Sequence, residues 1–311
     1  MQLDIVVAFF LLGAIATWCK ADFEVPKAIY RGCTQFLLLA IGIKGGIAFT
    51  QYPLATILPQ SLIVVAFGFC LPFLAYPILR TLGGWSRIDA ASTAAHYGSV
   101  SVATYAVAVA VLEGLNISYE AYFPLFVALL EIPAILAGLA IAKPGIFSSK
   151  AFGKAVHEMF FNEGVLLLIG GLLIGAWGAE RTERLLPFFG DLFHGVLALF
   201  LLELGRQAAT RIADIRREGP FLLSFSIAMP LVSASIAYWL GSSVLELSVG
   251  GLFLMMVLGS SASYIAVPAA MRSALPEANN ALAITASLAI TFPFNVLVAI
   301  PVYLNIAQLG N

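Results

Sequence analysis

Ten stretches of this sequence are apolar over about the length that crosses a bilayer, and this pattern constrains the fold more than any other feature. A helix needs about 20 predominantly apolar residues to span the hydrocarbon core. The stretches cover roughly residues 3–19, 29–50, 58–80, 89–113, 118–142, 158–178, 191–212, 219–241, 245–272 and 279–308. With 61% hydrophobic and only 11% charged residues, the chain has too little polar surface for a water-facing domain. The sequence therefore predicts an all-α polytopic membrane protein with ten transmembrane helices.

Lysine and arginine gather in the loops on one side of these spans. That side and its flanks hold Lys20, Lys27, Arg31, Arg80, Arg87, Lys143, Lys150, Lys154, Arg206, Arg211, Arg216, Arg217 and Arg272. The other side holds Arg181 and Arg184, and Lys44 lies inside a span. Because short basic loops stay in the cytoplasm, thirteen basic residues against two predict that both termini are extracytoplasmic. The expected location is a bacterial inner (plasma) membrane, crossed many times.

The two halves of the chain carry related features at matching places. Five spans in each half give the second half the opposite orientation in the membrane, which is the inverted-repeat architecture of many secondary transporters. Gly98-Ser99 in the first half corresponds to Gly259-Ser260 in the second. We therefore predict a first five-helix repeat over residues 1–142, a cytoplasmic linker over 143–157 and a second, inverted repeat over 158–311.

Two short stretches rich in small and hydroxyl residues, 96–104 and 259–264, interrupt the apolar spans. In a bilayer, irregular backbone is tolerated only where protein or a water-filled cavity satisfies its polar groups. If each helix restarts after its break, its N-terminus offers unpaired N–H groups and about half a positive charge to an anion. The candidate substrate-binding residues are Gly98, Ser99, Ser101, Thr104, Ser260, Ser261, Ser263 and Tyr264. The alternative is that small residues here only let helices cross closely.

Glu131 is the strongest candidate for binding a coupling ion, because a carboxylate inside a span is costly and marks function. It lies two residues before Pro133, which leaves the carbonyl of Leu129 without its helical hydrogen bond. Carboxylate and carbonyl oxygens suit a sodium ion or a proton, and we add the hydroxyls of Ser101 and Ser263 as candidate ligands. The alternative is a glutamate satisfied by a neighbouring hydroxyl or by water.

Other ionisable side chains within or beside the spans have structural explanations. Glu203 and Arg206 lie three residues apart on one helix face and are expected to pair. Lys44 is expected to extend toward the interface, and His96 is expected to be hydrogen-bonded. Two carboxylates beside a short turn are expected to face water: Glu113 and Glu120.

Motifs of enzymes and of ATP-driven transport are missing from the sequence. No Walker loop, Gly-x-Ser-x-Gly motif or dinucleotide fingerprint occurs. His157-Glu158 begins like a zinc-protease motif but lacks the second histidine. The sequence therefore predicts that the protein is not an enzyme and needs no cofactor other than a sodium ion. It also carries no basic patch that could bind nucleic acid.

Several short motifs follow one another along nearly the whole chain. They are residues 40–46 (Ala-Ile-Gly-Ile-Lys-Gly-Gly), 98–101 (Gly-Ser-Val-Ser), 119–121 (Tyr-Glu-Ala), 131–134 (Glu-Ile-Pro-Ala), 192–195 (Leu-Phe-His-Gly), 260–276 and 299–301 (Ala-Ile-Pro). In this order and spacing they resemble the sodium-dependent bicarbonate transporter family, best known from cyanobacteria. The resemblance implies two inverted five-helix repeats with a discontinuous helix in each half, core and gate subdomains interleaved in sequence, and a trimer. It also implies that an anion and sodium bind between the tips of the two broken helices.

The chain departs from cyanobacterial members at both helix tips. It has Ser-Val-Ala-Thr at residues 101–104 where they have Ser-Gly-Ser-Thr, and Ser-Ala-Ser-Tyr at 261–264 where they have Ser-Ser-Ser-Asp. Val102, Ala103 and Tyr264 are therefore the positions expected to alter the substrate. The 143–157 segment is short where those relatives carry a long insert, so regulation by a PII-like partner is not supported.

The predicted function is secondary active transport, as sodium-coupled symport of bicarbonate or another small anion. One alternative is a cation/proton exchanger or an organic-acid carrier on the same scaffold, with Glu131 exchanging the proton. Another is a membrane sensor or scaffold that transports nothing. The expected partners are the small anion, sodium, membrane lipid and further copies of the chain.

Overall fold

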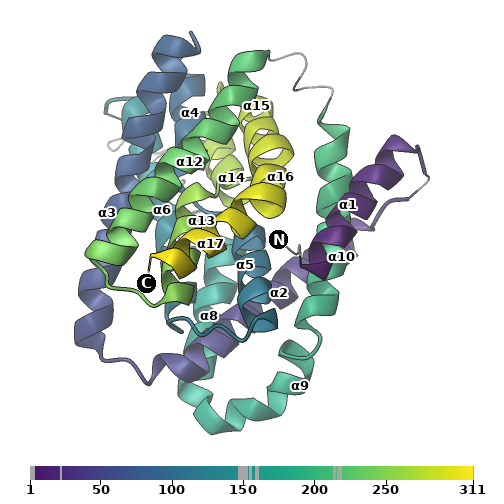
Figure 1. Ribbon diagram of the computed structural model, residues 1–311. Helices are drawn as coiled ribbons and strands as arrows, with labels where there is room; N and C mark the ends of the chain where they lie inside the picture. Colours follow the sequence, from purple (N-terminus) through teal and green to yellow (C-terminus); the bar gives the residue numbers. More distant parts are fainter. Residues whose placement is uncertain are drawn as a thin grey trace.

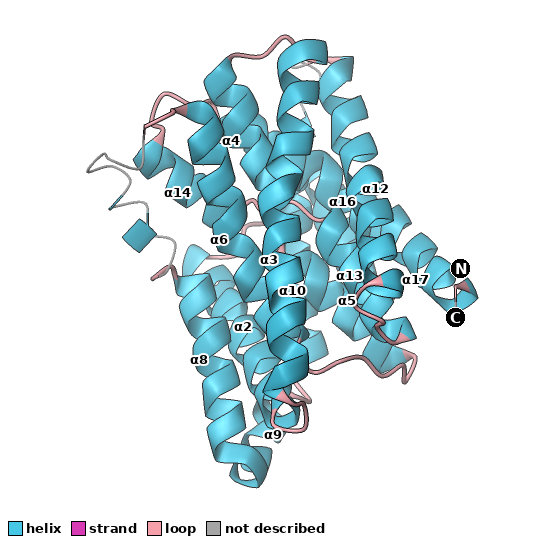
Figure 2. Cartoon of the chain, turned by 90° about the vertical axis from the view of Figure 1, so that its left-hand side faces the viewer, coloured by secondary structure: helices cyan, strands magenta, loops and turns pink. Residues whose placement is uncertain are grey.

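The computed structural model describes residues 4–21, 23–145, 161–212 and 219–310, together with Gly153, Val156, His157 and Ile215. Within these residues the chain forms helices and loops, without strands (Figure 1 and Figure 2). The helices are α1 (Ile5–Trp18), α2 (Lys27–Phe49), α3 (Leu54–Pro77), α4 (Arg87–Gly98), α5 (Val102–Gly114), α6 (Phe123–Ala142), α8 (Glu163–Gly178), α9 (Leu186–Phe189), α10 (Phe193–Thr210), α12 (Pro220–Ser243), α13 (Val249–Ser260), α14 (Ala266–Ala274), α15 (Asn280–Ile284), α16 (Phe292–Phe294) and α17 (Ile300–Leu309). Most of the predicted linker 143–157 lies outside the described residues.

Seven helical segments of the described chain are long and apolar enough to cross a membrane. They are Lys27–Phe49, Leu54–Leu82, Arg87–Gly114, Phe123–Ala142, Leu186–Thr210, Pro220–Ser243 and Asn280–Leu309. Three shorter apolar helices, Ile5–Trp18, Glu163–Gly178 and Val249–Ser260, accompany them. The predicted class, an all-α protein with several membrane spans, is therefore confirmed.

The helix breaks predicted at the two polar stretches are present in the structure. α4 ends before Ser99 and α5 begins after Ser101, while α13 ends before Ser261 and α14 begins after Ile265. Ser99 and Ser101 both have extended backbone. The Ser101 hydroxyl accepts the backbone N–H of Thr104 at 3.2 Å, so it caps the new helix. Serine favours such breaks because its hydroxyl competes for backbone hydrogen bonds.

Two ends of the helical bundle can be told apart by their contacts. At one end, Arg87 donates to the carbonyl of Ile141 at 2.8 Å, and Lys143 forms an ion pair with Glu277. At the other end, Asp4, Gly114 and Asn305 line one cavity, so α1 begins and α17 ends on the same side. We call these the basic end, with Arg87 and Lys143, and the opposite end.

Four helices, α1, α2, α8 and α10, form what we call the four-helix group. α1 packs along α10 (Figure 1), and α2 packs along α8 (Figure 2). Both pairs approach closely because they meet at glycines. A Cβ at Gly171 would lie 3.2 Å from the Cα of Gly42, and a Cβ at Gly13 or Gly205 would overlap a carbonyl of the facing helix. Apart from the short α9, the remaining helices, α3 to α6 and α12 to α17, form the crossing group.

These pairings are reciprocal between the halves of the chain. The first long helix described in the first half, α1, packs on the second long helix described in the second half, α10. In return, α2, the second of the first half, packs on α8, the first of the second half. In the crossing group, α3 packs on α4 in the same way that α12 packs on α13. Small residues serve the same purpose in both close pairs, since tight helix packing in lipid depends on them.

Predictions for the remaining charged side chains had mixed outcomes. Glu203 and Arg206 form the expected ion pair, at 2.7 Å. The prediction that Glu113 and Glu120 only face water was wrong. Glu113 pairs with Lys44 at 2.7 Å, and Glu120 accepts at 2.7 Å from the backbone N–H of the residue that caps α13. Lys44 therefore has a partner inside the protein, because α5 brings a carboxylate within its reach.

Candidate substrate site

The two helix breaks cross each other and are joined by hydrogen bonds. The N–H of Ser263 donates to the carbonyl of His96 at 2.9 Å, and the N–H of Ser101 donates to the Ser261 hydroxyl at 3.1 Å. His96 Nδ1 lies 2.6 Å from the carbonyl of Ser263. Because a carbonyl only accepts, Nδ1 carries the proton, as a hydrogen-bonded structural histidine would. The crossing thus satisfies backbone groups that membrane hydrocarbon could not.

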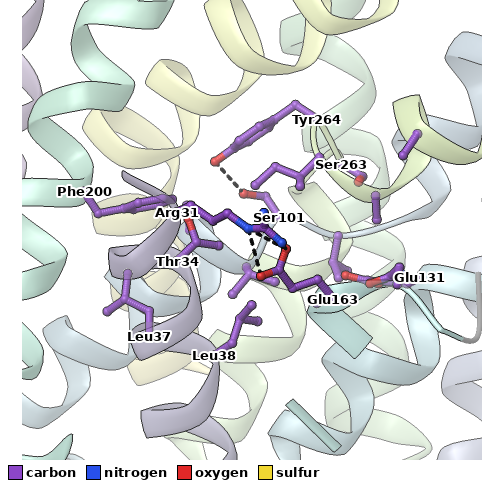
Figure 3. Close-up of a pocket in the computed structure, with 18 of the residues that line it drawn as sticks. Arg31, Thr34, Leu37, Leu38, Ser101, Glu131, Glu163, Phe200, Ser263 and Tyr264 are labelled. Carbon is purple, nitrogen blue, oxygen red and sulfur yellow. Dashed lines mark hydrogen bonds and ion pairs between the residues drawn. The ribbon is translucent and has the colours of Figure 1, made fainter. Parts of the chain in front are cut away.

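A cavity of about 320 Å³ lies beside this crossing, between the two helix groups (Figure 3). Its walls on the crossing group are Val100, Ser101, Val102, Ala103, Glu131, Ser263, Tyr264, Ile265, Ala266 and Ala269. Its walls on the four-helix group and the cap of α8 are Tyr30, Arg31, Thr34, Leu37, Leu38, Asn162, Glu163, Gly164 and Phe200. The surface that these residues present to the cavity is mostly apolar, so the polar groups among them decide what the cavity can bind.

Two helix N-termini reach the cavity, and a serine that lines the cavity accepts an N–H from the first turn of each helix. Ser101 Oγ accepts the N–H of Thr104 at the start of α5, and Ser263 Oγ accepts the N–H of Val267 at the start of α14, at 3.3 Å. Both serines are buried. Helix N-termini carry partial positive charge and unpaired N–H groups, so this wall of the cavity favours an anion.

Tyr264 lines the cavity and joins the two helix tips. The Ser101 hydroxyl donates to the Tyr264 hydroxyl at 3.2 Å, as Figure 3 shows. The tyrosine ring also meets Phe292 edge-on, with centroids 5.7 Å apart. A bulky ring therefore stands at the tip of α14, held by one polar and one aromatic contact.

Glu131, the predicted ion-binding carboxylate, lines the same cavity and is only 5% exposed. It comes from α6 of the crossing group, and its Oε2 accepts from Nδ2 of Asn162 at 3.2 Å. Asn162 caps α8 of the four-helix group by accepting the N–H of Val165. The carboxylate is therefore shared between the two helix groups, at one edge of the cavity.

The wall on the four-helix group contains charged residues that the sequence did not single out as site residues. Arg31 donates to Glu163 through Nε and Nη2, at 3.1 and 2.9 Å, and Glu163 also accepts from Gln35. Both charged side chains are partly exposed, at 69% and 40%. In the sequence, Arg31 and Glu163 are a basic and an acidic residue that each lie near the start of an apolar span. This pattern does not predict that they meet, because only the packing of α2 on α8 brings them together.

Five predicted site residues do not line the cavity: Gly98, Ser99, Thr104, Ser260 and Ser261. Gly98 packs against Pro72, where a Cβ would lie 2.6 Å from the proline ring. The two serines of the second break donate to carbonyls three residues back in α13, at 3.0 and 2.9 Å. The hydroxyls of Ser99 and Thr104 are buried without a hydrogen-bond partner among the described atoms. These residues build the layer of the crossing behind the cavity wall.

A cavity at the tips of two broken helices, inside an apolar helical bundle, is the arrangement typical of secondary transporters. The chain belongs to the Na+-dependent bicarbonate transporter superfamily, because the family model of that description matches residues 5–308. No curated protein matches the chain significantly. The family resemblance predicted from the motifs is confirmed, and membership makes this a membrane transport protein rather than an enzyme.

Proposed function

We propose that this protein is a secondary transporter that carries a small anion, bicarbonate or one like it, together with sodium. The observation that carries the proposal is the meeting of two helix N-termini, those of α5 and α14, at one cavity, where a serine hydroxyl accepts an N–H from the first turn of each helix. Two such ends favour an anion without a fixed cation beside it. Ser101 and Ser263 supply hydroxyls that can turn between capping the helix and binding the anion.

Sodium is the proposed coupling ion, and Glu131 is its proposed carboxylate ligand. Glu131 lies in the same cavity as the two serines, so an ion bound there would attract the anion directly. Its hydrogen bond to Asn162 joins the crossing group to the four-helix group. Binding of a cation at this carboxylate would therefore change a contact between the two parts that must move.

The proposed movement is a displacement of the four-helix group, as a gate, against the crossing group, as a core. The reciprocal pairing of α1 with α10 and of α2 with α8 supports two inverted five-helix repeats, the architecture on which alternating access depends. The charge pattern supports a bacterial inner membrane with the basic end in the cytoplasm and both termini outside.

A ligand screen by thermal unfolding tests this proposal in purified protein. Bicarbonate is expected to raise the melting temperature in sodium buffer and to have little effect in potassium buffer, because a ligand that binds only the folded state stabilises it by mass action. Matched chloride concentrations control for ionic strength. The proposal would be contradicted by folded protein that responds to no small anion in either buffer.

A second candidate, an organic-acid carrier, is favoured by the size and lining of the cavity. About 320 Å³ is far more than one bicarbonate ion fills, and Leu37, Phe200 and Tyr264 present apolar surface to it. A carboxylate with an apolar body would use both the helix tips and these side chains. In the same screen, this candidate predicts that short organic acids stabilise the protein more than bicarbonate does.

A further inference from the structure

A second cavity, of about 260 Å³, lies farther along the same contact between α2 and α5. Its walls are Ile41, Lys44, Gly45, Ala48, Tyr105, Val109, Glu113, Ser118, Tyr119, Ala121, Pro124 and Phe193. On α2 the lining passes from Leu38 in the first cavity to Ile41 in the second, and on α5 it passes from Ala103 to Tyr105. Since three residues are less than one helical turn, the two cavities are consecutive spaces between the same helices.

Packed side chains separate the two cavities. Leu38, Ile41, Ala103 and Tyr105 face this boundary and are between 0% and 4% exposed. Small shifts do not open a boundary packed this closely, because protein interiors resist continuous deformation. Opening it requires α2 and α5 to separate.

An ion pair joins α2 to α5 at the far side of this boundary. Lys44 Nζ of α2 lies 2.7 Å from Glu113 Oε1 of α5, and the two side chains are 26% and 27% exposed. The ammonium also lies 4.9 Å from the ring centroid of Phe193, and His194 Nε2 lies 4.0 Å from Glu113 Oε2. The partners of the Glu113 carboxylate thus come from α2 and α10 of the four-helix group, while Glu113 itself belongs to the crossing group.

The other ion pairs among the described residues stay within one helix group. Arg31 with Glu163 joins α2 to α8, Arg206 pairs with Glu203 in α10 and with Glu24 before α2, and Lys143 with Glu277 joins two parts of the crossing group. Among the residues that the structure describes, Glu113 is the only acidic residue that forms an ion pair with a lysine or arginine of the other helix group. A charge pair in this position is sensitive to the movement of one group against the other.

We infer that Lys44, Glu113 and His194 form a latch that holds the opposite end of the transporter closed while the first cavity is formed. The inference rests on the proposed alternating access, since it assigns a role in that movement to a contact outside the substrate site. A partly buried pair holds more strongly than a surface pair because water and salt screen it less. Breaking it shifts the population toward a state in which the opposite end is open.

The test measures from which side of the membrane a cysteine in the first cavity can be labelled. The reporter is Val102→Cys in a background of Cys19→Ser, Cys33→Ala and Cys70→Ser, which removes the three free cysteines. A membrane-impermeant maleimide is added to intact cells or to inverted vesicles. With Lys44 and Glu113 intact, labelling is expected from the basic end alone. Lys44→Met or Glu113→Gln is expected to raise the labelling rate from the opposite end about tenfold, within the usual range of coupling between sites.

Two further variants make the result specific to this pair. The exchange Lys44→Glu with Glu113→Lys rebuilds the ion pair and is expected to restore labelling from the basic end alone. It also serves as the test if the single variants do not reach the membrane. Glu203→Gln removes an ion pair within α10 and is expected to leave the labelling pattern unchanged.

The latch is contradicted if folded single variants show no increase from the opposite end, or if the exchange variant is labelled from that end. Folding is checked by size-exclusion elution and thermal unfolding of each variant. Labelling needs no transported substrate, so this result is independent of whether bicarbonate is carried. A failure of bicarbonate transport with a positive labelling result would contradict the proposed substrate and leave the latch in place.

Discussion

The hydroxyl oxygens of Ser101 and Tyr264 lie 3.2 Å apart, although the two residues belong to opposite halves of the chain. The same Ser101 oxygen caps α5 by accepting the N–H of Thr104. One buried hydroxyl therefore connects the restart of the first broken helix to the tip of the second. Changes at this oxygen are expected to alter both the stability of the fold and the properties of the cavity.

Replacement of Ser101 tests this connection, with Ser99 as a matched control. Ser101→Ala removes a helix cap, which costs about 1 kcal/mol, and leaves the Tyr264 hydroxyl without its partner, which costs about 1–3 kcal/mol. Ser99→Ala removes a buried hydroxyl that has no partner among the described atoms. We expect a clear drop in melting temperature for the first variant and little change for the second. Equal melting temperatures would contradict the role given to Ser101.

Glu131→Gln tests the proposed sodium ligand. The glutamine oxygen can still accept from Asn162, so the fold is expected to survive, while the charge that attracts a cation is lost. The rise in melting temperature with sodium concentration is expected to disappear. Glu203→Gln, which removes a carboxylate from α10 outside the cavity, is the control and is expected to keep the sodium response. An unchanged response in Glu131→Gln would exclude this carboxylate as the ligand.

Two glycines of α8 are expected to respond differently to one added methyl group. A Cβ at Gly175 would overlap the carbonyl oxygen of Ile43 on α2, whereas a Cβ at Gly170 meets nothing within 4 Å. Gly175→Ala is therefore expected to destabilise the protein by about 1–3 kcal/mol through overpacking. Gly170→Ala is expected to be neutral or slightly stabilising, since alanine favours helix. Thermal unfolding of both variants measures the difference, and similar values would contradict the close α2–α8 packing.

Acid is expected to weaken the contact between Lys143 and Glu277 at the basic end. A hydrogen bond from Lys143 lowers the pKa of the Glu277 carboxyl below its ordinary value of 4.5. A lowered pKa in the folded state means that the contribution to stability is present above pH 4.5 and is lost as the pH falls through the lowered pKa. The contribution is at most about 1 kcal/mol, because exposed ion pairs are screened. Glu277→Gln is expected to melt lower than the native protein at neutral pH and to match it in acid; a constant difference across the range would refute this.

The parts of the fold that depend on local sequence could be predicted from it. Apolar segments long enough to span a bilayer predicted an all-helical membrane protein. The serines around residues 99–101 and 261–263 predicted the helix breaks, since hydroxyls beside small residues favour an interrupted helix. The pairing of Glu203 with Arg206 was also predictable, because their spacing places them on one helix face.

The parts that depend on packing between distant helices could not be predicted in the same way. Arg31 and Glu163 are separated by 132 positions in the chain, and nothing in their local sequences indicates that α2 and α8 place them at one cavity. Glu113 was expected in water because it lies near a loop, and only the position of α2 brings Lys44 to it. In the candidate site, the residues at the helix tips could be predicted from the sequence. The residues of the facing wall, on the four-helix group, could be identified only from the fold.

Uptake of labelled bicarbonate into proteoliposomes tests the central claim most directly. With purified protein, an inward sodium gradient is expected to accelerate uptake, and an equal potassium gradient is not. Ser101→Ala with Ser263→Ala is expected to abolish the sodium-dependent part, because both helix tips then lose the hydroxyls that line the cavity. If folded native protein shows no sodium-stimulated uptake of bicarbonate or of any other small anion, the proposed function is wrong.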